Sequence, residues 1–452
     1  MINIRKFFRS AIIALLGCCF LGCQHYLDIK PDKSMATPGT LKDLHRLLNN
    51  FDAFNSGFPG LGEETSDDVW LTDARWAALD EVERSNYCFN NIETPVGRWH
   101  STYMAVVHSN IVLQGLIEID EPSSATYQRA HLEGGARFFR AHAYYQLAQV
   151  FAKHYNAATA GTELGIVLRR GTAIDEPLAR ATVAETYDAI ITDLQQACQL
   201  LPPSVRTTNL PNKAAAYGLL SRTYLTMGQY ELAGYYADSA LMYHDVLLDY
   251  NELDAGSNSP FPRFHEETIH LSRMTSSSVS TSRAAISPVL LASYAPHDLR
   301  HALFFRRNTD GTHRFKGSYD GSSGTTLFNG LSTAELYLTK AECLARKGQG
   351  EKALELMNRL LIHRWENGYF QPFTVDNTSD VLEFVLHERR KELVYRGIRW
   401  IDLRRLAAEG RLTEGIVRTV DNVVYELSAS QIPQYAYRIP LTAIQEGGYT
   451  QN

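Results

Sequence analysis

The sequence contains few cysteines, six in 452 residues, and three of them lie within the first 23 residues. The other three, Cys88, Cys198 and Cys343, are an odd number, which does not suit a framework of disulfide bonds. Cys198 and Cys343 both lie among apolar residues at helical spacing, so we expect them to be buried small hydrophobic side chains. No pattern of Cys and His residues has the spacing of a metal site, and neither a metal nor a cofactor is predicted.

An excess of basic residues is also missing. The 44 Lys and Arg residues face 50 Asp and Glu residues, which gives a net charge of -6. A chain with this balance lacks the electrostatic footprint of a nucleic-acid-binding protein, so we expect no nucleic-acid partner. The apolar fraction of 44% and the charged fraction of 21% are those of an ordinary globular protein.

The N-terminal apolar stretch, residues 11–22, is too short to span a bilayer as a helix. It follows three basic residues, and this combination predicts a secretory signal over residues 1–22. Residues 20–23 resemble a lipobox, in which the Cys23 thiol carries diacylglycerol and cleavage before Cys23 leaves its amino group for N-acylation. Several acyl chains on one cysteine anchor a protein stably, whereas a single chain is marginal. Residues 15–18 fit the same pattern, so Cys18 is an alternative attachment site, and release without an anchor is another alternative.

A late stretch of the chain, residues 382–406, combines a helical apolar pattern with many charges. Its apolar residues recur at helical spacing up to Leu393, which predicts that one face of a helix is buried. Gly397 is predicted to end this helix, because glycine tolerates the left-handed conformation found after a helix C-terminus. A second helix is expected to begin at Arg399.

The charged residues of this stretch are spaced for pairing between carboxylates and guanidinium groups. The expected pairs are Glu392 with Arg389 and Arg396, and Asp402 with Arg399 or Arg405. An arginine beside each acid keeps its pKa low, which disfavours a catalytic acid or base here. We therefore interpret the cluster as a structural lattice of ion pairs.

Residues 388–393, Glu-Arg-Arg-Lys-Glu-Leu, and residues 396–405, Arg-Gly-Ile-Arg-Trp-Ile-Asp-Leu-Arg-Arg, resemble the C-terminal signature of SusD-like (RagB/SusD) proteins. Residues 26–31 also resemble the segment that begins mature chains of that family, soon after the anchor cysteine. The resemblance implies a lipid-anchored, surface-facing protein of the outer membrane that binds a nutrient without cleaving it. It also implies a SusC-like TonB-dependent transporter as partner, and an architectural role for the signature itself.

Internal repeats indicate how the chain is organised. From Tyr217 the order of large, small and aromatic residues follows tetratricopeptide spacing, with Gly228 at the turn between two helices. The order recurs from Tyr337, with Gly348 at the turn. Stacking such helix pairs buries faces that one pair alone would leave exposed.

Two further helical blocks, residues 127–155 and 182–201, precede these repeats, and Thr182 with Glu185 has the spacing of a capping box. We therefore predict an all-α, tetratricopeptide-like superhelix with long irregular loop excursions. A single SusD-like domain is expected over residues 23–452, with an N-terminal part at 23–215 and a C-terminal part at 216–452.

Two stretches interrupt the helical pattern, residues 51–91 and residues 254–330. Long excursions from a rigid scaffold often carry binding sites. Sugars present apolar C–H faces and outward hydroxyls, so a glycan site needs aromatic rings beside carboxylates, amides or arginines. The predicted ligand contacts are Asp68, Trp70, Asp73, Arg75 and Trp76 in the first excursion, with Tyr319 of the second across a cleft. The alternative is that the two indole rings are core residues.

Three functions remain open at this point. A glycoside hydrolase would need two carboxylates about 5 to 10 Å apart across a cleft. An interaction scaffold is a second possibility, since tetratricopeptide repeats elsewhere bind peptides. We favour non-catalytic binding of an oligomeric nutrient, a glycan before a peptide, followed by its delivery to the transporter.

Overall fold

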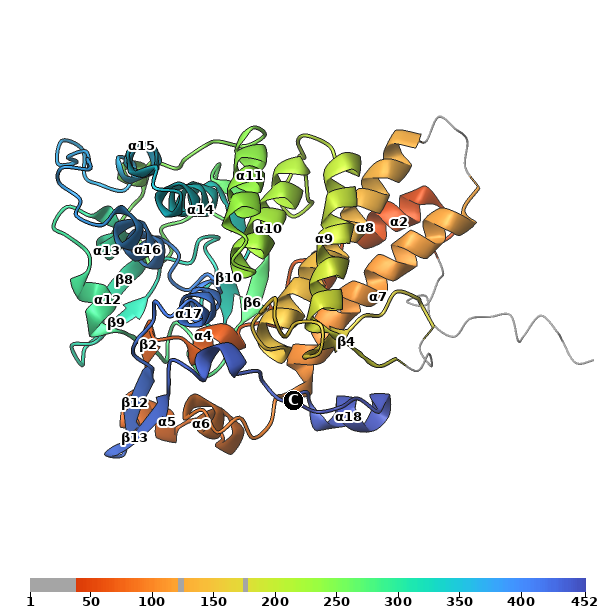
Figure 1. Ribbon diagram of the computed structural model, residues 1–452, viewed down its shortest axis with the longest axis horizontal. Helices are drawn as coiled ribbons and strands as arrows, with labels where there is room; N and C mark the ends of the chain where they lie inside the picture. The colour runs from red at the N-terminus through yellow and green to blue at the C-terminus, as the bar shows by residue number, and fades with distance from the viewer. Residues whose placement is uncertain (1–37, 121–125, 174–177) are drawn as a thin grey trace, which may run out of the picture.

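The computed structural model describes residues 38–120, 126–173 and 178–452, so the predicted signal (residues 1–22) and Cys23 lie outside the described residues. Helices dominate the fold, and the long ones pack against their neighbours largely in chain order (Figure 1). They are α2 (Leu41–Leu48), α7 (Val96–Glu118), α8 (Thr126–Phe151), α9 (Val183–Leu200), α10 (Lys213–Thr226), α11 (Tyr230–Leu241), α14 (Thr333–Arg346), α15 (Gly350–Leu361), α16 (Val381–Glu392) and α17 (Arg399–Ala408). The predicted all-α, tetratricopeptide-like scaffold is confirmed.

Helices α10 and α11 pack as one pair and α14 and α15 as another, as the repeat pattern predicts. Gly228 and Gly348 lie in the two connecting turns with φ values of +71° and +74°, a region that glycine enters without steric cost. Ala233 and Ala237 of α11 are completely buried, and their small side chains let the helices approach closely. Helix α11 also packs against α14, which joins the two repeats into one stack.

The N-terminal helices form the other half of the stack, with α7 against α8 and α8 against α9. Helix α9 begins with the predicted capping box, in which Thr182 accepts the N–H of Glu185 and the Glu185 carboxylate accepts the N–H of Thr182. Arg140 of α8 and Asp193 of α9 form two hydrogen bonds of 2.7 and 2.8 Å between the helices.

The two irregular excursions contain short helices and strands, and they pair with each other. Strand β1 (Phe58–Pro59) of the first lies parallel to β6 (Arg273–Thr275) of the second, and β10 (Thr326–Phe328) completes a three-stranded sheet. Strand β2 (Val69–Trp70) is antiparallel to β7 (Ala285–Ile286). Segments predicted as separate excursions therefore form one strand-containing layer beside the helical stack.

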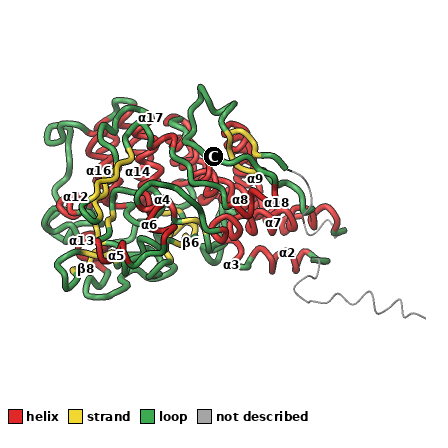
Figure 2. Tube along the Cα trace, turned by 90° about the horizontal axis from the view of Figure 1, so that it is seen from below, coloured by secondary structure: helices red, strands yellow, loops and turns green. Residues whose placement is uncertain are grey.

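The remaining strands form two-stranded pairs. They are β3 (Leu164–Val167) with β4 (Arg180–Thr182), β5 (Thr268–His270) with β11 (Leu331–Ser332), β8 (Phe305–Arg307) with β9 (His313–Phe315), and β12 (Ile416–Val420) with β13 (Val423–Leu427). The short helices are α3 (Phe51–Phe54), α4 (Leu61–Thr65), α5 (Asp73–Ala77), α6 (Glu81–Tyr87), α12 (Pro288–Ala292), α13 (Leu299–Phe304) and α18 (Leu441–Gly447). Seen from below, α5 and α6 lie toward the end that holds α12 and α13, away from α2 and α3 (Figure 2).

The three described cysteines, Cys88, Cys198 and Cys343, are free and buried, as predicted for the last two. Among the described residues, no group of three or more His, Cys, Asp or Glu side chains is placed to hold a metal ion. No helix in residues 38–120, 126–173 or 178–452 combines the length and apolar character needed to cross a membrane.

Candidate functional site

The C-terminal motif forms α16, a turn and α17, and most of its charged side chains are buried. Helix α16 ends at Glu392, ahead of Gly397, which has a φ of +72° within the following turn. Helix α17 begins at Arg399 as expected. Gly397 therefore shapes the link between the two helices rather than the last turn of α16.

Glu392 lies at the centre of this motif and has no exposed surface. Its carboxylate pairs with Arg364 at 3.0 Å and with Arg300 at 3.3 Å, two arginines from loops and short helices outside the motif. The predicted partner Arg396 is more distant, at 3.9 Å. Arg300 and Arg364 are themselves completely buried, so the carboxylate holds two positive charges in the interior.

Asp402 of α17 joins the two helices of the motif. It accepts a 2.9 Å bond from Arg389 of α16 and a 2.8 Å bond from Arg405 of its own helix. The predicted pairing of Arg389 with Glu392 is therefore wrong, whereas that of Asp402 with Arg405 is confirmed. Arg399, the other predicted partner of Asp402, instead makes two bonds of 2.6 and 2.8 Å to Asp67.

The same motif fixes the first excursion in place. Arg390 donates a 2.7 Å bond to Asp68 and lies 3.1 Å from Asp67, which Arg399 also contacts. Burial alone would raise the pKa of Asp67, but Arg399 and Arg390 outweigh it and lower that pKa to about 2. The acidic run before β2 is therefore an anchor for two arginines of the motif.

A third acid, Glu63, completes this cluster. It is 1% exposed, and one of its oxygens accepts the N–H of Gly397 at 2.6 Å. The other oxygen has no hydrogen-bond partner within the described parts of the chain. Burial, together with the nearby Asp68, raises the pKa of Glu63 to about 8. With Glu63 neutral, Arg390 and Arg399 face Asp67 and Asp68, and burial raises the pKa of Asp68 although both arginines act to lower it.

Two of the six predicted ligand contacts lie in the interior. Asp68 has no exposed surface and Tyr319 is 1% exposed. The guanidinium carbon of Arg396 lies 3.6 Å from the centre of the Tyr319 ring, and the ring of His265 meets it edge-on at 4.3 Å. Neither side chain can contact a ligand at the surface of this structure, so both are corrected to architectural residues.

The two predicted tryptophans, Trp70 and Trp76 of the first excursion, are half-buried. Trp70 on β2 donates its indole N–H to the carbonyl of Ile286 at 3.2 Å. Trp76 on α5 donates to the carbonyl of Arg84 at 3.3 Å, and the Arg84 guanidinium carbon lies 5.8 Å from the ring centre. Each indole N–H is bonded to a backbone carbonyl, and each tryptophan is partly buried as a residue.

Asp73 and Arg75 lie on α5 between these two rings in the sequence. Asp73 is exposed and accepts the N–H of Asp421, at the tip of the β12–β13 hairpin, at 3.1 Å. Arg75 pairs with Asp310, in the turn between β8 and β9, at 2.9 Å. A second nitrogen of Arg75 is buried and lacks a partner among the residues that the structure describes. Helix α5 is thus tied to two loops that the sequence did not connect with it.

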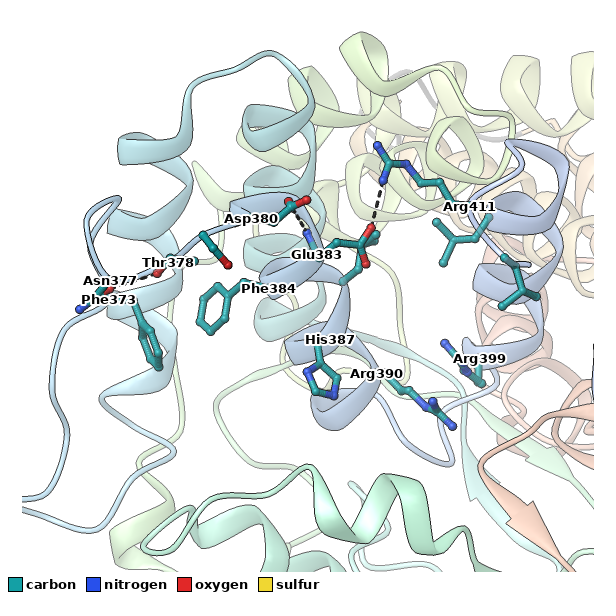
Figure 3. A pocket seen from close by; sticks show the side chains of 14 residues that line it. Phe373, Asn377, Thr378, Asp380, Glu383, Phe384, His387, Arg390, Arg399 and Arg411 are labelled. Carbon is teal, nitrogen blue, oxygen red and sulfur yellow. Dashed lines mark hydrogen bonds and ion pairs between the residues drawn. The ribbon is translucent and has the colours of Figure 1, made fainter. Parts of the chain in front are cut away.

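A separate pocket of about 530 Å³ lies between α16, α17 and the loop before α16 (Figure 3). Phe373 and Phe384 pack on one wall with ring centres 4.4 Å apart. Glu383 pairs with Arg411 across the rim at 3.0 Å, and Asp380 caps α16. The other two arginines of the pocket, Arg390 and Arg399, are those that pair with Asp67 and Asp68. Glu383 and the three arginines of this pocket are therefore already paired with other charged side chains, while Asp380 makes only the N-cap bond. No sequence signal pointed to this pocket beyond the motif arginines in its wall.

Two sequence models of one family match the chain. The model described as "Starch-binding associating with outer membrane" matches residues 25–225, and the model described as "SusD family" matches residues 306–438. The chain therefore belongs to the SusD/RagB family, as the C-terminal motif predicts. A search of curated proteins gave no match.

Solved structures with the same fold cover most of the chain. A putative sugar-binding protein from Bacteroides vulgatus superposes with a TM-score of 0.74 at 22% identity, over 92% of this chain and 99% of that one. A SusD superfamily protein from Bacteroides thetaiotaomicron gives 0.72 at 21% identity, over 91% and 99%. A laminarin-binding SusD-like protein gives 0.63 at 17% identity, over 90% and 97%. At these identities the likeness establishes the fold.

Proposed function

We propose that the protein is a surface lipoprotein of the outer membrane that binds an oligomeric nutrient, a glycan, without cleaving it. One observation carries this proposal. In a chain of the SusD/RagB family, two half-buried tryptophans, Trp70 and Trp76, lie in the sequence on either side of an exposed acid, Asp73, and an arginine, Arg75. Aromatic faces stack on sugar C–H surfaces, while the carboxylate and guanidinium bond to hydroxyls. Two structural relatives, one described as a putative sugar-binding protein and one as laminarin-binding, favour a glycan over a peptide.

Weak binding suits this role. Each hydrogen bond to a sugar hydroxyl replaces one to water, so the net gain per contact is small. A protein that passes its ligand on must also release it. We therefore expect a micromolar dissociation constant, about -8 kcal/mol or weaker.

A glycoside hydrolase is the less favoured function. Two acids of the first excursion are engaged by arginines: Asp68 is buried against Arg390, and Asp67 is held ionised by Arg399. Glu63, whose raised pKa would suit a general acid, is 1% exposed. Asp68 and Glu63 are buried and Asp67 is paired with arginines, so these three carboxyl groups support the fold rather than attack a substrate.

The test is titration calorimetry of purified protein against a panel of oligosaccharides and peptides, with chromatography of each mixture after incubation. Saturable binding of a glycan with no cleavage products is the expected result. Cleavage products would indicate an enzyme, saturable binding of peptides alone would establish the peptide alternative, and no binding would favour a scaffold.

The proposal includes a lipid anchor at Cys23, a single domain over residues 23–452 and delivery to a SusC-like TonB-dependent transporter. The family description "associating with outer membrane" and the N-terminal signal pattern support the location. The pairing of strands between residues 58–70 and 273–286 supports one domain, because it joins the N-terminal and C-terminal parts. Purification from membranes in mild detergent should recover a large transporter protein together with this chain, and elution of the chain alone would contradict the pairing.

A further inference from the structure

A pocket of about 490 Å³ opens in the second excursion, between strand β9 and two serine-rich loops. It lies apart in sequence from Trp70–Trp76 and from the pocket of Figure 3. Its lining consists of Asn258, Ser259, Thr281, Ser282, Arg314, Phe315, Lys316, Ser322, Ser323 and Gly324. Two cationic side chains and five hydroxyl groups line this basic pocket, and no carboxylate does.

The cations of the basic pocket are not neutralised by ion pairs within the described residues. Arg314 is half-buried and makes neither an ion pair nor a side-chain hydrogen bond there. Lys316 donates to two backbone carbonyls, those of Ala255 at 2.5 Å and Ser257 at 3.0 Å, which orient its ammonium group without cancelling its charge. Burial and the nearby Arg306 lower the pKa of Lys316, as expected for a cation that lacks a full counter-charge.

Two acids linked to this lining, Asp320 and Asp254, accept bonds from other groups. Asp320 is 2% exposed and pairs with Arg273 at 2.5 Å, while it also accepts bonds from Ser318 and Ser322. Asp254, the one acid that attracts Lys316, is exposed and accepts the N–H of Gly256. The basic pocket therefore keeps an excess of positive charge.

Arg306 is a third cation beside the basic pocket and adds to its positive charge. Arg306 of β8 lies directly opposite Arg314 of β9, so the two side chains leave the same face of the hairpin. The guanidinium of Arg306 bonds to the side-chain oxygen of Asn258, a neutral acceptor that lines the pocket. Arg307 is opposite His313 and therefore points to the other face.

We propose that the basic pocket binds the anionic substituent of an acidic glycan, a uronate carboxylate or a sulfate ester. This inference rests on the proposed glycan-binding function and narrows its ligand class. Arg314 and Lys316 supply charge-assisted hydrogen bonds to the anion. The hydroxyl groups and Asn258 supply acceptors and donors for the sugar hydroxyls around it. A neutral glycan would leave the two cations without a counter-charge in the bound state.

The experiment uses the full mature chain and an array of defined oligosaccharides. The acidic set contains fragments of galacturonan, chondroitin and chondroitin sulfate, and the neutral set contains fragments of galactan, glucan and mannan. The variants are Arg314→Gln with Lys316→Gln, and the matched control Arg307→Gln on the opposite face of the hairpin. Calorimetry then compares each bound oligosaccharide with its methyl ester or its desulfated form, which separates uronate from sulfate recognition.

We expect the bound oligosaccharides to be acidic, with at least a tenfold loss of affinity in the double variant and on removal of the anionic group. The Arg307→Gln control should bind as the wild type does. Binding of neutral oligosaccharides alone would overturn this inference and leave the proposed function standing, as would a folded double variant with unchanged affinity. Failure of the wild type to bind any oligosaccharide would overturn both.

Discussion

Arg390 donates a 2.7 Å hydrogen bond to Asp68, although the two residues are 322 positions apart in the chain. Asp68 is completely buried and immediately precedes β2, the strand that carries Trp70. The C-terminal motif thus fixes the position of the segment proposed to contact the ligand. Together with the pairs of Arg390 and Arg399 to Asp67, this ion pair links the architecture to the proposed binding segment.

Replacing Arg390 with Ala should destabilise the protein by about 3 to 5 kcal/mol, because it leaves the buried Asp68 short of a counter-charge. Arg399 lies 3.8 Å from Asp68 and will recover part of that loss. Chemical denaturation measures the effect. The matched control is Arg411→Ala, whose pair with Glu383 is exposed and should contribute about 0 to 1 kcal/mol. Equal losses in the two variants would contradict the account.

Replacing Glu392 with Ala should also unfold or weaken the protein, since Arg300 and Arg364 would remain buried without their shared carboxylate. Arg389→Ala should act in the same way by leaving Asp402 with one partner fewer. Thermal melting with a parallel binding assay distinguishes structure from function. An unchanged melting temperature together with lost ligand binding would show that this cluster of ion pairs belongs to the binding site.

Glu63 should make stability fall as pH rises. Its folded pKa of about 8 lies above the ordinary value of 4.5, so the folded state holds a proton that the unfolded state releases between these two values. The free energy of unfolding should fall by about 1.4 kcal/mol for each pH unit in that window, and this fall should level off above pH 8.

Glu63→Gln mimics the protonated side chain and should remove this dependence. The stability of the variant relative to the wild type should therefore increase from pH 5 to pH 8, as measured by denaturation at each pH. A constant difference across this range would show that Glu63 is not protonated in the folded protein.

Lipid attachment is expected at Cys23, because it follows a glycine at the end of the apolar stretch. Labelling of cells with a fatty-acid analogue should mark the wild type and Cys18→Ala but not Cys23→Ala. Label retained in Cys23→Ala and lost in Cys18→Ala would assign the anchor to Cys18 instead.

The sequence predicted the features that depend on local spacing. The repeat pairs around Gly228 and Gly348 and the capping box at Thr182 follow from short-range patterns, and the structure confirms them. The motif's charges were also predicted to form a structural lattice, and most of them are buried in ion pairs, whereas Arg404 donates to the backbone carbonyls of Gln149 and Ala152.

The partners within that lattice were harder to predict. Glu392 pairs with Arg300 and Arg364, which neighbouring loops bring in from outside the motif, so spacing along one helix could not identify them. Tyr319 was expected to contact the ligand across a cleft from the first excursion. The structure instead places its ring beneath Arg396, a contact that depends on how the two excursions fold together.

The most direct test of the account is calorimetry of Trp70→Ala and Trp76→Ala with the glycan identified by the panel. Loss of a stacked ring should cost about 1 to 3 kcal/mol by analogy with stacking of bases on aromatic side chains. The matched control is Tyr235→Ala, an exposed aromatic residue on α11. Both tryptophan variants should remain folded by circular dichroism and bind at least fivefold more weakly, while the tyrosine variant should bind normally. Folded tryptophan variants that bind the glycan as tightly as the wild type would contradict the account.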